Sequence, residues 1–115
     1  MQKDDLVRLQ HMRDAAREAI AFAKGKPRAA LDSNRMLALS LVKDLEIIGE
    51  AASQVTEPTQ ATYPQLPWRN IIAMRNRLIH GYFDIDLDRV WDTLTTDLPP
   101  LVEALESILH SSTDN

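Results

Sequence analysis

The residues that could do chemistry lie in one short stretch. Arg75 is followed by Asn76 and, five positions after the arginine, by His80; Tyr82 comes two positions later. An imidazole exchanges a proton near neutral pH, and a guanidinium binds phosphate oxygens through a fixed fork of donors. These groups, without metal or thiol, suit RNA cleavage by the 2′-hydroxyl, which needs a proton moved and negative charge on the phosphate stabilised.

Other interpretations of Arg75 remain open on spacing alone. A guanidinium keeps its charge, so burying it without a partner is costly. Arg75 could form a buried ion pair with a carboxylate, for which Glu50 is the candidate, or it could hold an anion without catalysis.

The element that must position these residues is predicted to be one helix from Pro67 to Gly81. Proline suits a first helical turn, and glycine suits the exit. In a continuous helix the apolar residues share one side, and Arg75 lies near its middle; these residues are Trp68, Ile71, Ile72, Leu78 and Ile79. Arg75 should therefore meet a carboxylate or carbonyl oxygens, or open onto a cleft.

Composition narrows the possible partners. The chain has 115 residues, a net charge of −4 and no cysteine, which suits a single domain over residues 1–115 and excludes disulfides and thiolate metal sites. Residues 58–83 contain no acidic residue but hold Arg69, Arg75 and Arg77, which indicates a local positive site, and we expect Arg69 and Arg77 to bind RNA there. No long apolar run and no signal-like start are present, which predicts a cytoplasmic protein that does not enter membranes.

The remaining chain predicts an all-α bundle of four or five helices. Helices are expected over 3–24 (where His11 is interpreted as solvated), from Asp32 or Ser33 to about residue 54, and from Leu87 after a cap at Asp84 or Asp86. Residues 55–66 should be a loop because they hold prolines, and the helix from Leu87 either breaks or kinks at Pro99-Pro100.

The second of these helices is apolar over most of its circumference. A narrow polar strip runs along it, made of Ser40, Lys43, Glu46, Glu50 and Ser53. A helix of this kind is either central in its domain or buried on two sides, by its own domain and by another subunit. Because its apolar surface exceeds what a small monomer should expose, we expect a homodimer. Gly49 in its interior predicts the close approach of another helix.

The stretch Arg75–Tyr82 resembles the Arg-x4-His-x-Tyr motif of the HepT-like toxins of the HEPN superfamily. Further matching segments occur in the same order, so that the resemblance covers most of residues 37–101; they are residues 47–52, 67–69, 82–86, 90–91 and 97–99. The resemblance implies a HEPN fold that dimerises with two motifs in one cleft. It also implies a metal-independent and cofactor-free endoribonuclease acting on tRNA or mRNA, with Arg75 and His80 as catalytic residues and Asn76 in support.

The resemblance further implies a toxin–antitoxin pair. The antitoxin of this family resembles a minimal nucleotidyltransferase and adds AMP to the motif tyrosine, here Tyr82. The rival hypothesis is a non-catalytic HEPN subunit that binds a nucleotide or a nucleotidyltransferase partner and cuts nothing. A purely structural role would need Arg75 paired with Glu50 inside one subunit, away from any opening.

Overall fold

The computed structural model describes residues 1–79 and 84–113, and this part of the chain is all-α, as predicted. Its only β-type pairing is an isolated bridge between Ile79 and Ile85. No helix there is long and apolar enough to cross a membrane. The elements, in order, are α1 (Lys3–Ala23), α2 (Ala30–Ser33), α3 (Arg35–Ser53), α4 (Glu57–Thr62), α5 (Trp68–Ile72), α6 (Met74–Leu78), α7 (Leu87–Asp92), the π-helical η1 (Thr93–Asp97) and α8 (Leu98–Thr113).

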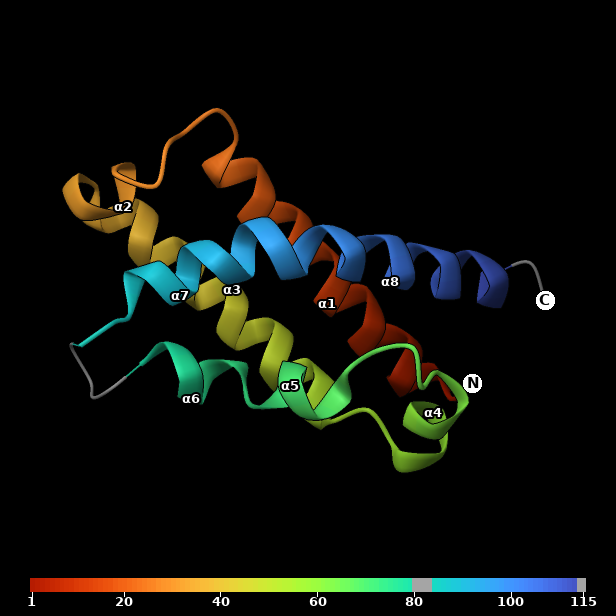
Figure 1. The fold of residues 1–115 in the computed structure, drawn as a ribbon. Coiled ribbons are helices and arrows are strands. Elements are labelled where there is room, and N and C mark those ends of the chain that lie inside the picture. The colour runs from red at the N-terminus through yellow and green to blue at the C-terminus, as the bar shows by residue number, and fades with distance from the viewer. Residues whose placement is uncertain (80–83, 114–115) are drawn as a thin grey trace.

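Three long helices build the core. Helices α1 and α3 run antiparallel and pack along their length, and α8 packs across α1 (Figure 1). The apolar stripe predicted on residues 3–24 supplies Leu9 and Met12, which are fully buried with Leu41 and Leu45 of α3 and Leu105 of α8. The periodicity therefore identified the core faces correctly, because each long helix buries one stripe.

The helix ends agree with the sequence in part. Gly25 follows α1 with a φ of +75°, the left-handed conformation expected of a glycine that ends a helix. Asn34, and not Asp32 or Ser33, caps α3 by accepting a hydrogen bond from the Leu37 amide at 3.0 Å. The prediction was wrong because Asp32 and Ser33 belong to the separate short helix α2.

Two proline-containing segments are helical. Pro58 occupies the first turn of α4, where its missing amide has no partner to lose, so the predicted loop over residues 55–66 contains a helix. Pro99 and Pro100 lie in the first turn of α8, which begins at Leu98 directly after the π-helical turn η1. The chain therefore continues through both prolines, with the irregular turn at the site where regular hydrogen bonds would fail.

The helix predicted from Pro67 to Gly81 is divided at Ala73, where φ is −81° and ψ is 0°. Because of this break, the residues of α6 that face the core differ from those that would face it in an unbroken helix. Met74 and Leu78, one turn apart in α6, are buried, whereas Ile72 is 38% exposed and the Arg75 side chain is 61% exposed. The placement of Arg75 within the apolar face was wrong, because that projection assumed an unbroken helix.

The close approach predicted at Gly49 is confirmed. A Cβ atom built on Gly49 would lie 3.1 Å from the carbonyl oxygen of Ile71 and 3.5 Å from that of Ile72. The end of α5 therefore lies directly on the backbone of α3, and the following helix, α6, begins after one intervening residue, Ala73.

Candidate functional site

Arg75 extends from α6 toward α3, where its nearest acidic partner is Glu46. Its Nε lies 3.6 Å from Glu46 Oε1, a long ion pair with a mostly exposed guanidinium. Pairs of this kind contribute little to stability, and most of the donors of the arginine remain available to a ligand. Glu50, the partner considered from the sequence, instead accepts a hydrogen bond from Gln54 Nε2 at 2.9 Å.

Arg75 lines an open groove of about 450 Å³ between α1, α3 and α6. The groove is lined by Arg8, His11, Lys43, Glu46, Ile47, Glu50, Ala51, Gln54 and Arg75. Arg8 is held in place by its Nε, which donates to Gln54 Oε1 at 3.0 Å. Three permanent cations therefore face two carboxylates, an arrangement that can accept a phosphodiester.

The polar strip on α3 forms one wall of this groove. The strip was predicted from the sequence, but the groove was not. Lys43, Glu46 and Glu50 recur at threes and fours, and Arg8 and His11 of α1 have the same spacing. His11, interpreted as a solvated residue, is exposed but lines the groove with Arg75. The helical spacing could have grouped these residues on each helix, but only the packing of α1 on α3 brings the two rows together.

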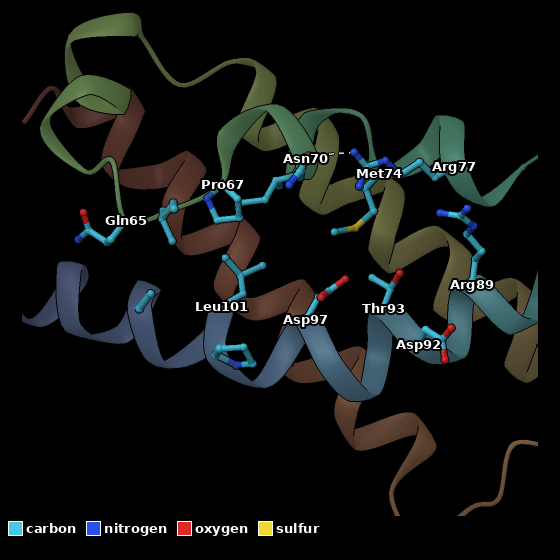
Figure 2. Close-up of a pocket in the computed structure, with 14 residues that line it drawn as sticks. Gln65, Pro67, Asn70, Met74, Arg77, Arg89, Asp92, Thr93, Asp97 and Leu101 are labelled. Atoms are coloured by element: carbon cyan, nitrogen blue, oxygen red, sulfur yellow. Dashed lines mark hydrogen bonds between the residues drawn. The ribbon is translucent and has the colours of Figure 1, made fainter.

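The other residues predicted for the site are dispersed. Arg77 lies in a second cleft, toward α7, η1 and α8, where its Nη2 donates to Asn70 Oδ1 at 2.8 Å (Figure 2). Asn76 and Arg69 are exposed and line neither the groove nor this cleft. His80 and Tyr82 lie outside the described residues.

Two buried carboxyl groups lie outside the groove. Burial, reinforced by the hydrogen bond and negative charge of Glu18, raises the pKa of Asp44 on α3 to about 7. Burial also tends to raise the pKa of Asp5. Hydrogen bonds donated by Thr56 and Thr59 outweigh this effect and hold the pKa of Asp5 below its ordinary value. Asp5 thus ties α1 to the start of α4, and we assign it a structural role.

Comparison with known proteins places these features in a family. The sequence profile named "Ribonuclease HepT-like" matches residues 12–108. "Putative RNase MJ1380" of Methanocaldococcus jannaschii is 30% identical over 95 residues, which are 83% of this chain and 87% of that protein. "Putative RNase TTE0752" of Caldanaerobacter subterraneus is 30% identical over 102 residues, 89% of this chain and 91% of the relative.

A further relative is named for the family itself. "Probable ribonuclease HepT" of Thermococcus cleftensis is 36% identical over 69 residues, 60% of this chain and 63% of that protein. No solved structure matches the chain. The profile match spans most of the sequence and includes α3, α5, α6 and the groove residues from α3 and α6. The chain belongs to the ribonuclease HepT-like family.

Proposed function

We propose that this ribonuclease is a metal-independent endoribonuclease that uses Arg75 and His80 as catalytic residues, with Asn76 in support. The observation that carries the proposal is the state of Arg75: its guanidinium is 61% exposed, weakly paired at 3.6 Å and placed in an open groove. A structural arginine would be enclosed by its partner, which was the alternative left open by the sequence. An exposed cation in a concave site is instead available to a phosphate oxygen.

The proposed reaction is an internal transesterification. The His80 imidazole takes the proton of the 2′-hydroxyl, whose oxygen attacks the adjacent phosphorus while Arg75 stabilises the added negative charge on the non-bridging oxygens. The 5′-oxygen takes a proton from a solvent water molecule as it leaves, and the imidazolium later returns its proton to solvent, which gives a 2′,3′-cyclic phosphate and a free 5′-hydroxyl. Lys43 and Arg8 line the same groove and would hold flanking phosphates.

We further propose that the active form is a homodimer with two motifs in one shared cleft. Support comes from the outward face of α3, where Met36 is 80% and Leu39 44% exposed although both are large apolar residues. A second copy of α3 is a fitting cover for such a face, because both copies present the same residues.

Control of this activity is proposed to act on Tyr82. In this proposal, a nucleotidyltransferase antitoxin adds AMP to the phenol, which brings bulk and negative charge next to His80 in the sequence. Both would oppose binding of an RNA phosphate by Arg75. Family membership and the motif support this part of the proposal.

The proposed reaction is tested with an RNA substrate from which one 2′-hydroxyl, the nucleophile of the reaction, has been removed. After the main cleavage position in an RNA oligonucleotide is mapped, the nucleotide on its 5′ side is replaced by the 2′-deoxy form. We expect cleavage there to cease while other positions remain sensitive, and we expect products with 2′,3′-cyclic phosphate ends. Cleavage at the deoxy position, or products with 5′-phosphate ends, would contradict the mechanism.

A further inference from the structure

A second cleft lies on the other side of α6 from the Arg75 groove. It has a volume of about 490 Å³ and separates α5 and α6 from the layer formed by α7, η1 and α8 (Figure 2). Met74 and Leu101 reach into it from opposite walls, and Leu66 and Ile71 complete an apolar floor. A volume of this size suits a small ring system.

The rim of the cleft carries two cations that are suited to a phosphate. Arg77 is oriented by its bond to Asn70 at 2.8 Å, which uses one of its five N–H donors. Arg89 faces Arg77 across the opening in Figure 2, and its Nε is 3.9 Å from Asp86 Oδ2, a long and weak pair. Two guanidinium groups on one opening can hold a phosphate oxygen between them.

The irregular turn η1 places two acceptors on the same cleft. In an α-helix, Asp92 and Asp97 would point about 140° apart, since each residue turns the chain by about 100°. The i→i+5 turn of a π-helix brings residues five apart onto one side, and Asp92 and Asp97 both line the cleft. Within the described residues neither carboxyl has a hydrogen bond or ion pair, so both are available to a ligand.

We infer that this cleft binds one unstacked nucleotide of the RNA substrate and reads its base, an inference that rests on the proposed function. The base would lie on the apolar floor, its exocyclic amine would donate to Asp92 or Asp97, and its phosphate would lie on Arg77 and Arg89. Carboxylates accept hydrogen bonds but do not donate them, and the exocyclic amine of cytosine offers two N–H donors where uracil offers one, at N3, so bases with an amino group, such as cytosine, are preferred over uracil.

The position of the cleft fits a single RNA strand that serves both sites. Arg75 and Arg77 are two residues apart on the one-turn helix α6, yet they line different openings. A strand that crosses α6 would present its scissile phosphate to Arg75 and a nearby nucleotide to the cleft. The cleft would then select where along the RNA the cut falls.

The inference is tested by binding without cleavage. Fluorescently labelled 2′-O-methyl hexamers of cytidine and uridine differ at C4 and N3 of the base, where cytosine has an amine donor and a ring acceptor and uracil has a carbonyl acceptor and a ring N–H donor. Neither hexamer can be cut through a 2′-hydroxyl. We expect wild-type protein to bind the cytidine hexamer about tenfold more tightly, the discrimination typical of one paired base edge. Asp92→Asn and Asp97→Asn, which can donate as well as accept, should bring this ratio close to one.

Matched variants separate base reading from charge. Glu103→Gln makes the same charge change on α8 outside the cleft and should keep the tenfold preference. Arg77→Ala should weaken both hexamers by a similar factor, since it removes a phosphate contact. Ala104→Trp should fill the cleft and abolish the preference, and circular dichroism would check that each variant keeps its helical content.

Two outcomes would overturn the inference: equal binding of the two hexamers by the wild type, or a preference that survives both aspartate substitutions and the Ala104→Trp filling. The result is independent of catalysis. A protein that discriminates the hexamers but leaves RNA intact would reject the proposed function and not the base-reading cleft. A protein that cuts RNA but binds both hexamers equally would reject the base-reading cleft and not the proposed function.

Discussion

Arg75 has the chemistry of a phosphate ligand because the surrounding residues leave most of its guanidinium in solvent. The pair with Glu46 joins one nitrogen and one oxygen at 3.6 Å, and such an exposed pair gains little over hydration. The negative charge of Glu46 nevertheless lies in the groove where we propose that an RNA phosphate binds. Glu46 is therefore expected to weaken RNA binding while contributing little to the fold.

Glu46→Gln tests this reading of the groove. We expect the substitution to tighten RNA binding about threefold at low salt, an effect that shrinks toward none at 0.5 M salt because mobile ions screen exposed charges. The measurement is a fluorescence titration with 2′-O-methyl RNA, which is not cut. Glu50→Gln, on the same groove but hydrogen-bonded to Gln54, should give a smaller change. Weaker binding by Glu46→Gln would show that this residue orients Arg75.

The sequence singled out candidate functional residues, but it did not predict the surroundings in which the structure places Arg75. The motif singled out Arg75 for a specific reason, its spacing to His80 and Tyr82, and the family profile covers these positions. The identity of its partner could not be predicted. Whether Arg75 meets Glu46 or Glu50 depends on the break at Ala73, and neither glycine nor proline marks that position.

Among the contacts between helices, the one between α3 and α5 positions the candidate site, because α6, which carries Arg75, follows α5 in the chain. Gly49 lets the carbonyl oxygens of Ile71 and Ile72 approach the backbone of α3, and α6 follows one residue later. The sequence predicted this approach because glycine destabilises the interior of a helix, so its presence there indicates that a neighbouring backbone comes close. The division of the next helix was not predictable, since it follows from packing rather than from residue preference.

Gly49→Val should destabilise the protein by about 2 kcal/mol, because a branched side chain would be forced against backbone carbonyls that cannot rotate away. Gly49→Ala should cost less, since alanine favours the helix by about 1 kcal/mol and adds a single methyl group. Urea unfolding followed by circular dichroism measures both. Loss of cleavage in a folded Gly49→Val protein would fit displacement of α6, whereas unchanged stability would contradict the described packing.

The α1–α3 interface contains a carboxyl group that should make stability depend on pH. The pKa of Asp44 is raised to about 7 by burial and by Glu18, from an ordinary value of 3.8. Between these values the folded protein holds a proton that the unfolded chain has lost, so stability falls as pH rises through this window. Above about pH 7 the full cost of the buried negative charge remains.

Asp44→Asn should remove this dependence, because an amide can donate a hydrogen bond to Glu18 as the protonated acid does. We expect the variant to be about 1 to 2 kcal/mol more stable than wild type at pH 8 and nearly equal at pH 5. Urea unfolding at the two pH values measures the difference, and both lie above the acidic range in which Asp5 should matter. A wild-type stability that rises from pH 5 to pH 8 would contradict the assignment.

The long regular helices α1 and α3 were predictable, whereas short helices and irregular turns were not. The first and second helices predicted from the sequence correspond to α1 and α3 within a few residues, because each buries one continuous apolar face. The outcome at Pro99-Pro100 was left open between a break and a kink. The chain continues there through the π-helical turn η1, a solution that depends on the packing of α8 and has no signature in the residue types.

At the scale of the whole molecule, the outward side of α3 is the surface that we propose a second copy covers. Met36 and Leu39 expose apolar side chains next to the polar strip that forms the groove. If a second copy covers this face, the two grooves come close and the motifs can share one RNA strand. The proposed activity is then linked to assembly.

The double variant Met36→Gln with Leu39→Gln should shift the protein from dimer to monomer and lower cleavage at least tenfold. The reason is that two polar amides replace apolar surface that a subunit interface would bury. Light scattering at micromolar concentration measures the mass. Phe22→Gln, which removes an apolar side chain of similar exposure (41%) from α1, is the control and should leave mass and activity unchanged. A wild type that is already monomeric would contradict the shared cleft.

The most direct test of the central claim is an RNA cleavage assay in EDTA that compares wild type with Arg75→Ala and His80→Ala. We predict that the wild type cuts RNA under these conditions and that each substitution lowers the rate at least a hundredfold, with circular dichroism showing an unchanged fold. Cleavage that persists in both variants, or that disappears from the wild type when EDTA is added, would contradict the account.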